Sequence, residues 1–246
     1  MLQYRVAVPA VDHFPSTHGT WLEQQLDRVT ISDVADAAEA QIALRKHLME
    51  RYYEPLCIYV QARPLMALGE PADIVGDFFA RDFDAISFLQ RWRASGMPLR
   101  RWVMNAMALH CKGLIRDAAR IARRRDTAAN VEAVPDSDAG AERAFDRTWA
   151  LGIASKAFWI AQSDAEARGR PQDAIAFRRH VIDGLEHDEI ARQLGISASQ
   201  SSNACRRVST RMREAIGDLL RQDGVPAGQI DAAIAEVLAL VREAGR

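Results

Sequence analysis

Residues 187–197, with the sequence HDEIARQLGIS, constrain the fold most strongly because they have the form of a helix-turn-helix. Ile190, Ala191 and Leu194 are spaced to share one apolar face of a helix. Gly195 follows them and supplies a tight turn, and Ser197 can cap the next helix. We therefore expect two helices joined by a short turn, the second of which is a candidate DNA reader.

The second helix is expected to run from about residue 198 to residue 220. Its polar faces carry side chains of the types that bond to base edges and phosphates, namely Gln200, Asn203, Arg206, Arg207 and Arg211. The alternative is a small helical hairpin with a solvated basic face. Agreement at several fixed offsets favours the helix-turn-helix. Ser201 departs from the pattern, since a hydrophobic residue is expected there, and we expect a weaker contact between the two helices.

Periodicity elsewhere predicts an all-α chain. Alanine, leucine, arginine and glutamate dominate, and strand-like alternation is absent from the sequence. With 246 residues and an apolar fraction of 48%, the chain is long enough for two small domains or one large one. The expected helices cover residues 33–62, 71–83, 84–94, 99–125, 144–168, 171–184, 187–194, 198–221 and 227–243.

Charge is segregated along the chain although the formal net charge is only −1. Residues 1–90 carry seven basic and thirteen acidic side chains, whereas residues 91–125 carry ten basic side chains and one acidic one, Asp117. Acidic residues, small polar residues and Pro135 follow, without apolar periodicity. Residues 126–143 are therefore expected to be an acidic linker between two domains.

The basic helix expected at residues 99–125 is a candidate nucleic-acid surface. Lys112, Arg116 and Arg120 recur every four residues, so like charges stack on one face, and a polyanion would relieve their repulsion. Near the start of the helix, cations, an aromatic ring and an amide suit the unstacked bases of a single strand. These residues are Arg100, Arg101, Trp102 and Asn105. The alternatives are a merely solvated basic face and a core position for Trp102.

The helix expected at residues 71–83 combines acidic and apolar side chains. Pro71 suits the first helical turn, and Asp73 favours the positive end of the helix dipole. The apolar stripe beside Asp73 and Asp77 suits docking onto a basic surface of a partner. Its members include Ile74, Phe78 and Phe79. The alternative is that both phenylalanines are core residues and both aspartates are solvated.

Several classes of function lack support in the sequence. An apolar run of membrane-spanning length and the apolar core of a secretory signal are both missing, so we expect a cytoplasmic protein without membrane insertion. The three cysteines are far apart and suggest small core residues rather than disulfides or a metal site. Clusters such as residues 186–189 lack an accompanying nucleophile or metal-ligand spacing. We expect neither an enzyme nor a cofactor.

These features together resemble the extracytoplasmic-function (ECF) sigma factors of bacterial RNA polymerase, in particular the planctomycete-type branch. The likeness covers most of the chain. It rests on an entry motif at residues 14–17 with Trp21, the segment 52–56, the acidic-aromatic segment 72–80, the basic helix, residues 145–150, and the series Ala204, Arg207, Arg211, Arg213 and Glu214.

The resemblance implies four parts. Residues 1–125 would hold an N-terminal extension and the helical bundle of sigma region 2, residues 126–143 the linker, residues 144–222 the helix-turn-helix of sigma region 4, and residues 223–246 a helical extension. Asp73, Ile74, Asp77, Phe78 and Phe79 would dock on core polymerase. The minus-10 element would be opened by Arg100, Arg101, Trp102 and Asn105, with Lys112, Arg116 and Arg120 along the backbone. Gln200, Asn203, Arg206, Arg207 and Arg211 would read the minus-35 element.

The chain also departs from the family pattern. Leu99 stands where the family usually has phenylalanine, Gly113 where it has an acidic residue, and Ser201 and Ser202 where it has Val-Lys, so base preferences do not transfer. Residues 27–41 look like an insertion. The partners implied are core RNA polymerase and promoter DNA, with an anti-sigma protein, a kinase or the chain's own extensions as candidate regulators. The alternative function is a free-standing helix-turn-helix transcriptional regulator.

Overall fold

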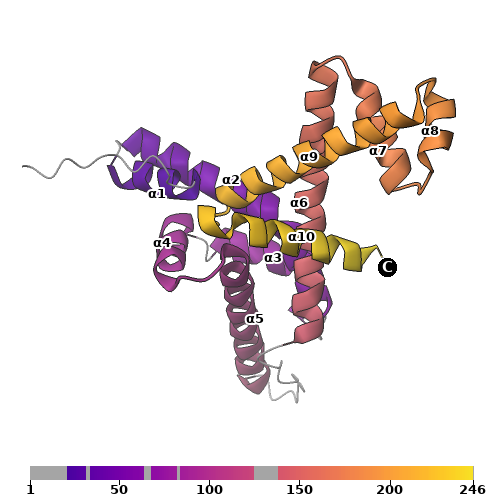
Figure 1. Ribbon diagram of the computed structural model, residues 1–246. Coiled ribbons are helices and arrows are strands. Elements are labelled where there is room, and N and C mark those ends of the chain that lie inside the picture. The colour runs from indigo at the N-terminus through magenta and orange to yellow at the C-terminus, as the bar shows by residue number, and fades with distance from the viewer. Residues whose placement is uncertain (1–20, 32–33, 64–67, 82–83, 125–137, 246) are drawn as a thin grey trace, which may run out of the picture.

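The computed structural model describes residues 21–31, 34–63, 68–81, 84–124 and 138–245, and within them the fold is all-helical (Figure 1). The first five helices are α1 Trp21–Ile31, α2 Val34–Gln61, α3 Pro71–Arg81, α4 Ala85–Ser95 and α5 Leu99–Arg124. They are followed by α6 Ala139–Ala167, α7 Pro171–Val181, α8 His187–Leu194, α9 Ala198–Gln222, the short 3-10 helix η2 Ala227–Gln229 and α10 Ile230–Ala244. The expected all-α class is confirmed for these residues.

Helix ends follow local sequence signals. Asp84 caps α4 by accepting a hydrogen bond from the backbone N–H of Ile86, and Gly96 ends this helix in the left-handed conformation. Asp138 caps α6 by accepting from the N–H groups of Gly140 and Ala141. Short polar side chains satisfy N–H groups that the first turn of a helix leaves free. These caps explain where α4 and α6 begin.

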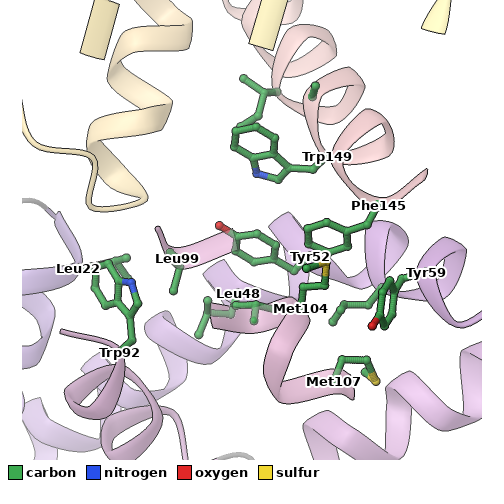
Figure 2. Close-up of a cluster of buried hydrophobic side chains, with 14 of the residues drawn as sticks. Leu22, Leu48, Tyr52, Tyr59, Trp92, Leu99, Met104, Met107, Phe145 and Trp149 are labelled. Atoms are coloured by element: carbon green, nitrogen blue, oxygen red, sulfur yellow. The ribbon is translucent and has the colours of Figure 1, made fainter. Parts of the chain in front are cut away.

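The main hydrophobic core lies where α2 and α6 pack together. Phe145 of α6 stacks on Tyr52 with ring centroids 6.4 Å apart and meets Tyr59 edge-on at 6.3 Å. Figure 2 shows these rings beside Met104 and Met107 of α5. Aromatic contacts of this geometry add to the stabilisation from burial alone. The core continues into α1, α3, α4, α9 and α10.

A smaller core holds the helix-turn-helix end of the molecule. It joins the C-terminal part of α6 to α7, α8 and the N-terminal part of α9, through side chains that include Phe177, Ile190, Ala204 and Val208. Helix α9 reaches from this core to the main one, and α6 crosses it (Figure 1). These two long helices therefore connect the two cores.

Several boundaries differ from those expected. Helix α1 lies where the sequence analysis predicts no helix. Helices α1 and α2 occupy most of residues 27–41, the expected insertion. Helix α6 begins at Ala139, so the last residues of the expected linker are helical. Residues 126–137 and the entry motif at residues 14–17 lie outside the described residues. The main core also contains side chains from both sides of the expected linker, such as Tyr52, Phe145 and Leu219.

None of the described helices is long and apolar enough to cross a membrane. Cys111 and Cys205 are buried and Cys57 is half-buried, and none forms a disulfide. Burial raises the pKa of the Cys111 thiol to about 11, as expected for a small core residue.

Candidate nucleic-acid interface

The α8–α9 unit has the geometry of a helix-turn-helix. Gly195 adopts a left-handed conformation with φ of 65°, which a residue with a Cβ adopts at a cost. Ser197 and Gln200 form a reciprocal cap at the start of α9. The backbone N–H of Gln200 donates to Ser197 Oγ at 3.1 Å, and the N–H of Ser197 donates to Gln200 Oε1 at 2.7 Å. The turn and the start of α9 are thus both fixed by sequence-local contacts.

A polar contact replaces the missing hydrophobic residue at position 201. Ser201 is fully buried, and its hydroxyl lies 3.0 Å from Nδ1 of His187 at the start of α8. The His187 ring stacks on His180 with centroids 4.2 Å apart, and Nδ1 of His180 lies 2.9 Å from the carbonyl oxygen of Leu185. The hydrogen bond between His187 and Ser201 therefore maintains the contact between α8 and α9, and the ring stacking joins α8 to α7.

The five candidate minus-35 residues lie on α9, but they are not equally accessible. Gln200 and Arg206 are exposed, and Arg206 also donates to Asn203. Arg207 donates two hydrogen bonds to the carboxylate of Asp173, at 2.8 and 2.7 Å, and this bonding raises the pKa of the Arg207 guanidinium. A nucleic acid that bound Gln200 or Arg206 would not have to displace a carboxylate, as it would at Arg207.

Arg211 is also engaged by carboxylates. Its Nε donates to Asp164 at 2.8 Å, and it pairs with Glu214 at 3.5 Å. These contacts hold the guanidinium against α6, so its role in the fold competes with a role in DNA contact. The sequence pattern identified the arginines of this face but not their partners.

Two further arginines join this face from the turn between α6 and α7. Arg168 and Arg170 line a cavity of about 540 Å³ together with Arg206, Arg207 and Arg211. Arg168 pairs with Asp164 at 3.3 Å. Neither residue belongs to the site predicted from the sequence, although the run Arg168-Gly169-Arg170 is a local basic signal.

Helix α5 separates its candidate residues into two groups. Arg116 and Arg120 are exposed and line an open hollow with Gly113, Asp117 and Arg123. Arg123 is not among the DNA-contact residues predicted from the sequence. Lys112 is half-buried. Arg120 also pairs with Asp117 at 3.0 Å. The distal part of α5 therefore presents cations to solvent.

The proximal residues of α5 are drawn into the protein. Arg101 pairs with Asp146 at 3.0 Å and with Glu142 at 3.3 Å. Burial raises the pKa of the Asp146 carboxyl, and the nearby Arg100 and Arg101 oppose that rise. Arg100 contacts Asp146, Glu236 and the ring of Trp149.

The aromatic and amide members of this group differ from each other in exposure. Trp102 is half-buried, with its ring 5.9 Å from that of Phe88. Asn105 is exposed and contacts Met97 Sδ at 3.8 Å. Trp92 fixes the preceding loop, because its Nε1 donates to the carbonyl oxygen of Met97 at 2.8 Å. Figure 2 shows Trp92 near Leu99, at the start of α5.

The acidic-aromatic helix α3 buries its apolar side. Ile74, Phe78 and Phe79 are each less than 5% exposed, so the structure assigns these side chains to the core, as in the alternative considered from the sequence. Asp73 is exposed. Asp77 is half-buried and lies 3.8 Å from Nε2 of His110. Asp73 is therefore the most accessible of the five residues proposed for polymerase docking.

Comparison of the chain with protein-family models, with curated proteins and with solved structures finds no match. Groups of side chains suited to holding a metal ion are also missing from the described part of the chain. The site is rich in cationic side chains, a residue type that in nucleic-acid complexes forms hydrogen bonds and ion pairs with phosphates and base edges.

Proposed function

We propose that the protein is an alternative sigma factor of bacterial RNA polymerase, similar to the ECF type, that directs transcription from a specialised class of promoters. In this proposal α9 reads the minus-35 element, α5 contacts the minus-10 element, and the acidic end of α3 docks on core polymerase. The observation that carries the proposal is the capped helix-turn-helix accompanied by a second cationic helix in the same chain.

The helix-turn-helix supplies the duplex-reading part. Helix α9 presents Gln200 and Arg206 from its first three turns, in the N-terminal part, which is the part of a recognition helix that meets base edges. Arg168 and Arg170 stand beside it and suit phosphate contacts that fix the orientation of the duplex. Phosphate contacts and base contacts would thus come from adjacent elements.

The cationic helix α5 supplies the second DNA contact. Arg116, Arg120 and Arg123 lie within about two turns, and a helix with this charge gains affinity for nucleic acid by releasing counterions. A regulator that reads only duplex DNA has no need of this second surface. When one of two DNA-contacting surfaces in a chain is bound, the other is held near its own promoter element at a raised effective concentration.

A free-standing helix-turn-helix regulator is the second candidate. It is favoured by the engagement of Arg100 and Arg101 with Asp146, which removes part of the proposed minus-10 surface from solvent. Such a regulator would bind duplex DNA without polymerase, usually as a dimer on a palindrome.

Transcription in vitro tests the proposal and separates these candidates. Sigma-free core polymerase is supplied with the chain and with fragmented bacterial genomic DNA, and new transcript starts are mapped. We expect specific starts that require the chain. Arg206→Ala should reduce them about tenfold by removing a base or phosphate contact, whereas Arg221→Ala, the same charge change in the last turn of α9, should leave them unchanged. Duplex binding without any chain-dependent start would favour the regulator.

A further inference from the structure

Helix α10 places a carboxylate in direct contact with one of the candidate DNA-binding arginines. Glu236 of α10 forms an ion pair with Arg100, which is 136 residues earlier and lies in the first turn of α5. The Arg100 side chain is 11% exposed, whereas that of Glu236 is 50% exposed. The carboxylate that covers Arg100 is therefore itself within reach of solvent and of a competing anion.

Other contacts hold the Arg100 guanidinium under this acid. It lies over the ring of Trp149, 4.8 Å from the centroid, and its Nε lies 3.8 Å from Asp146 Oδ1. The guanidinium thus keeps one face on Trp149 while Glu236 occupies an outer position. A phosphate that took the place of Glu236 would replace the charge-assisted contact between Arg100 and the carboxylate with one between Arg100 and the phosphate.

Apolar packing places Glu236 at this point. Ile230, Ile234 and Val237 of α10 are buried in the main core, against α6 and α9. Glu236 lies between the last two of these on the rim of that contact. Helix α10 therefore needs no contact with Arg100 in order to stay folded against the protein.

The turn before α10 is also fixed to the N-terminal helices. Asp223 is 3% exposed in its side chain and meets His47 at 2.9 Å and Arg51 at 3.2 Å, both from α2. Gly224 packs against the ring of Trp92, which holds the loop before Arg100. This turn and that loop line a common cavity of about 640 Å³ with Arg100 and Glu236. The start of α10 and the start of α5 are thus held in one arrangement, with open space beside the ion pair.

We propose that Glu236 is an intramolecular competitor of nucleic acid for Arg100, so that α10 lowers the affinity of the α5 surface for DNA until phosphate displaces the carboxylate. This inference rests on the proposed role of α5 in DNA contact. The occupant of the surface is a defined segment of the chain itself, Ile230–Ala244, and the competing ligand is a nucleic-acid phosphate.

The test is a fluorescence-anisotropy titration of a labelled 20-nucleotide single strand of mixed sequence at low salt. It compares the full chain with Glu236→Gln and Asp231→Asn. Asp231 lies on the same helix but pairs with Arg213 at 3.0 Å, so the two variants lose the same charge and differ in whether Arg100 is released. We expect Glu236→Gln to bind about fivefold more tightly than the other two chains.

A double variant shows whether the gain passes through Arg100. Arg100→Ala combined with Glu236→Gln should return the affinity to that of the unmodified chain or below it. The proposed competition would be contradicted if Glu236→Gln and Asp231→Asn bound the single strand equally. It would also be contradicted if the gain in affinity persisted in the double variant with Arg100→Ala. Titration of the unmodified chain with core polymerase separates the two proposals. If the chain binds polymerase but Glu236→Gln leaves the affinity for the single strand unchanged, only the proposed competition is contradicted. If the chain does not bind polymerase, the sigma-factor proposal is contradicted.

Discussion

At the scale of single residues, the helix-turn-helix depends on a polar pair in which Ser201 is fully buried and His187 is half-buried. Ser201 is enclosed between α8 and α9, and its hydroxyl has the His187 ring as its partner. A buried polar group that loses its partner costs more free energy than a made hydrogen bond contributes. Ser201 should therefore matter for stability although it is a poor substitute for an apolar residue.

Ser201→Ala should lower the free energy of unfolding by about 1–2 kcal/mol, because Nδ1 of His187 loses its partner. The matched control is Ser202→Ala, which makes the same chemical change at the next, exposed position of α9. Urea unfolding followed by circular dichroism measures both. An equal effect of the two substitutions would show that the hydrogen bond between Ser201 and His187 contributes nothing to stability.

Gly224→Ala should destabilise the protein by about 2 kcal/mol or more. Gly224 has φ of +82°, and a Cβ there would overlap the Trp92 ring, 2.8 Å from Cζ2. Gly169→Ala is the control, since Gly169 has φ of +69° with open space around the added atom. Thermal unfolding should rank Gly224→Ala well below Gly169→Ala, and equal midpoints would mean that Trp92 moves aside freely.

The polar residues of α9 could be identified from the sequence, but the carboxylates that bind its arginines could not. Arg207 is bound by Asp173 and Arg211 by Asp164, acids that lie 34 and 47 residues earlier. Periodicity assigns a side chain to a face of its own helix and contains no information about a carboxylate on another helix. Only the structure shows that Gln200, Arg206 and Arg207 are all exposed and that, of these three, Arg207 is bound to a carboxylate.

At the scale of elements, α9 and the turn after it connect both ends of the molecule. The N-terminal part of α9 packs with α7 and α8, and its C-terminal part packs with α6 and α10. Asp223, directly after α9, is bonded to α2. The position of the helix-turn-helix relative to α2 therefore depends on this one buried carboxylate together with the apolar contacts.

Asp223→Asn should lower the free energy of unfolding by about 3–5 kcal/mol. The side chain of Arg51 is 7% exposed, and removing the charge of Asp223 leaves that guanidinium buried without its ion pair. Asp218→Asn, one turn earlier on the exposed side of α9, should change stability by less than about 1 kcal/mol. Chemical denaturation measures the two, and a small effect at position 223 would contradict the assigned role of this buried pair.

Helices with a clear apolar period were predicted well, whereas their ends depended on caps. Helix α8 has the expected bounds, and α9 differs by a single residue at its end. Helix α1 was missed because Trp21 was assigned to a family motif rather than to an apolar face with Leu22 and Leu26. The start of α6 was missed because Asp138, its cap, was interpreted as one more acidic residue of a linker.

At the scale of the whole molecule, one core includes side chains from α1 to α6 and from α9 and α10. Four of the five tryptophans, namely Trp21, Trp92, Trp102 and Trp149, lie in this core or pack against it. Shared burial of this kind couples the stability of the elements that contribute to it. The sequence could not reveal the coupling, because the residues in contact are far apart along the chain.

Unfolding should therefore give the same midpoint by tryptophan fluorescence and by helical circular dichroism. The fluorescence reports mainly on the main core, and the circular dichroism reports on all helices. Both should be recorded in one denaturant series. Two separated midpoints would contradict the shared core and indicate that the helix-turn-helix end unfolds independently.

A fluorescence-anisotropy titration of the labelled full chain with sigma-free core polymerase tests the proposal that this chain binds core RNA polymerase. Asp73→Arg reverses the exposed acid at the start of α3, and Asp231→Arg makes the same change on α10. We predict tight, saturable binding that Asp73→Arg weakens at least about tenfold and Asp231→Arg leaves unchanged. Absence of binding by the unmodified chain would contradict the sigma-factor account, and equal binding by all three would contradict the docking role of α3.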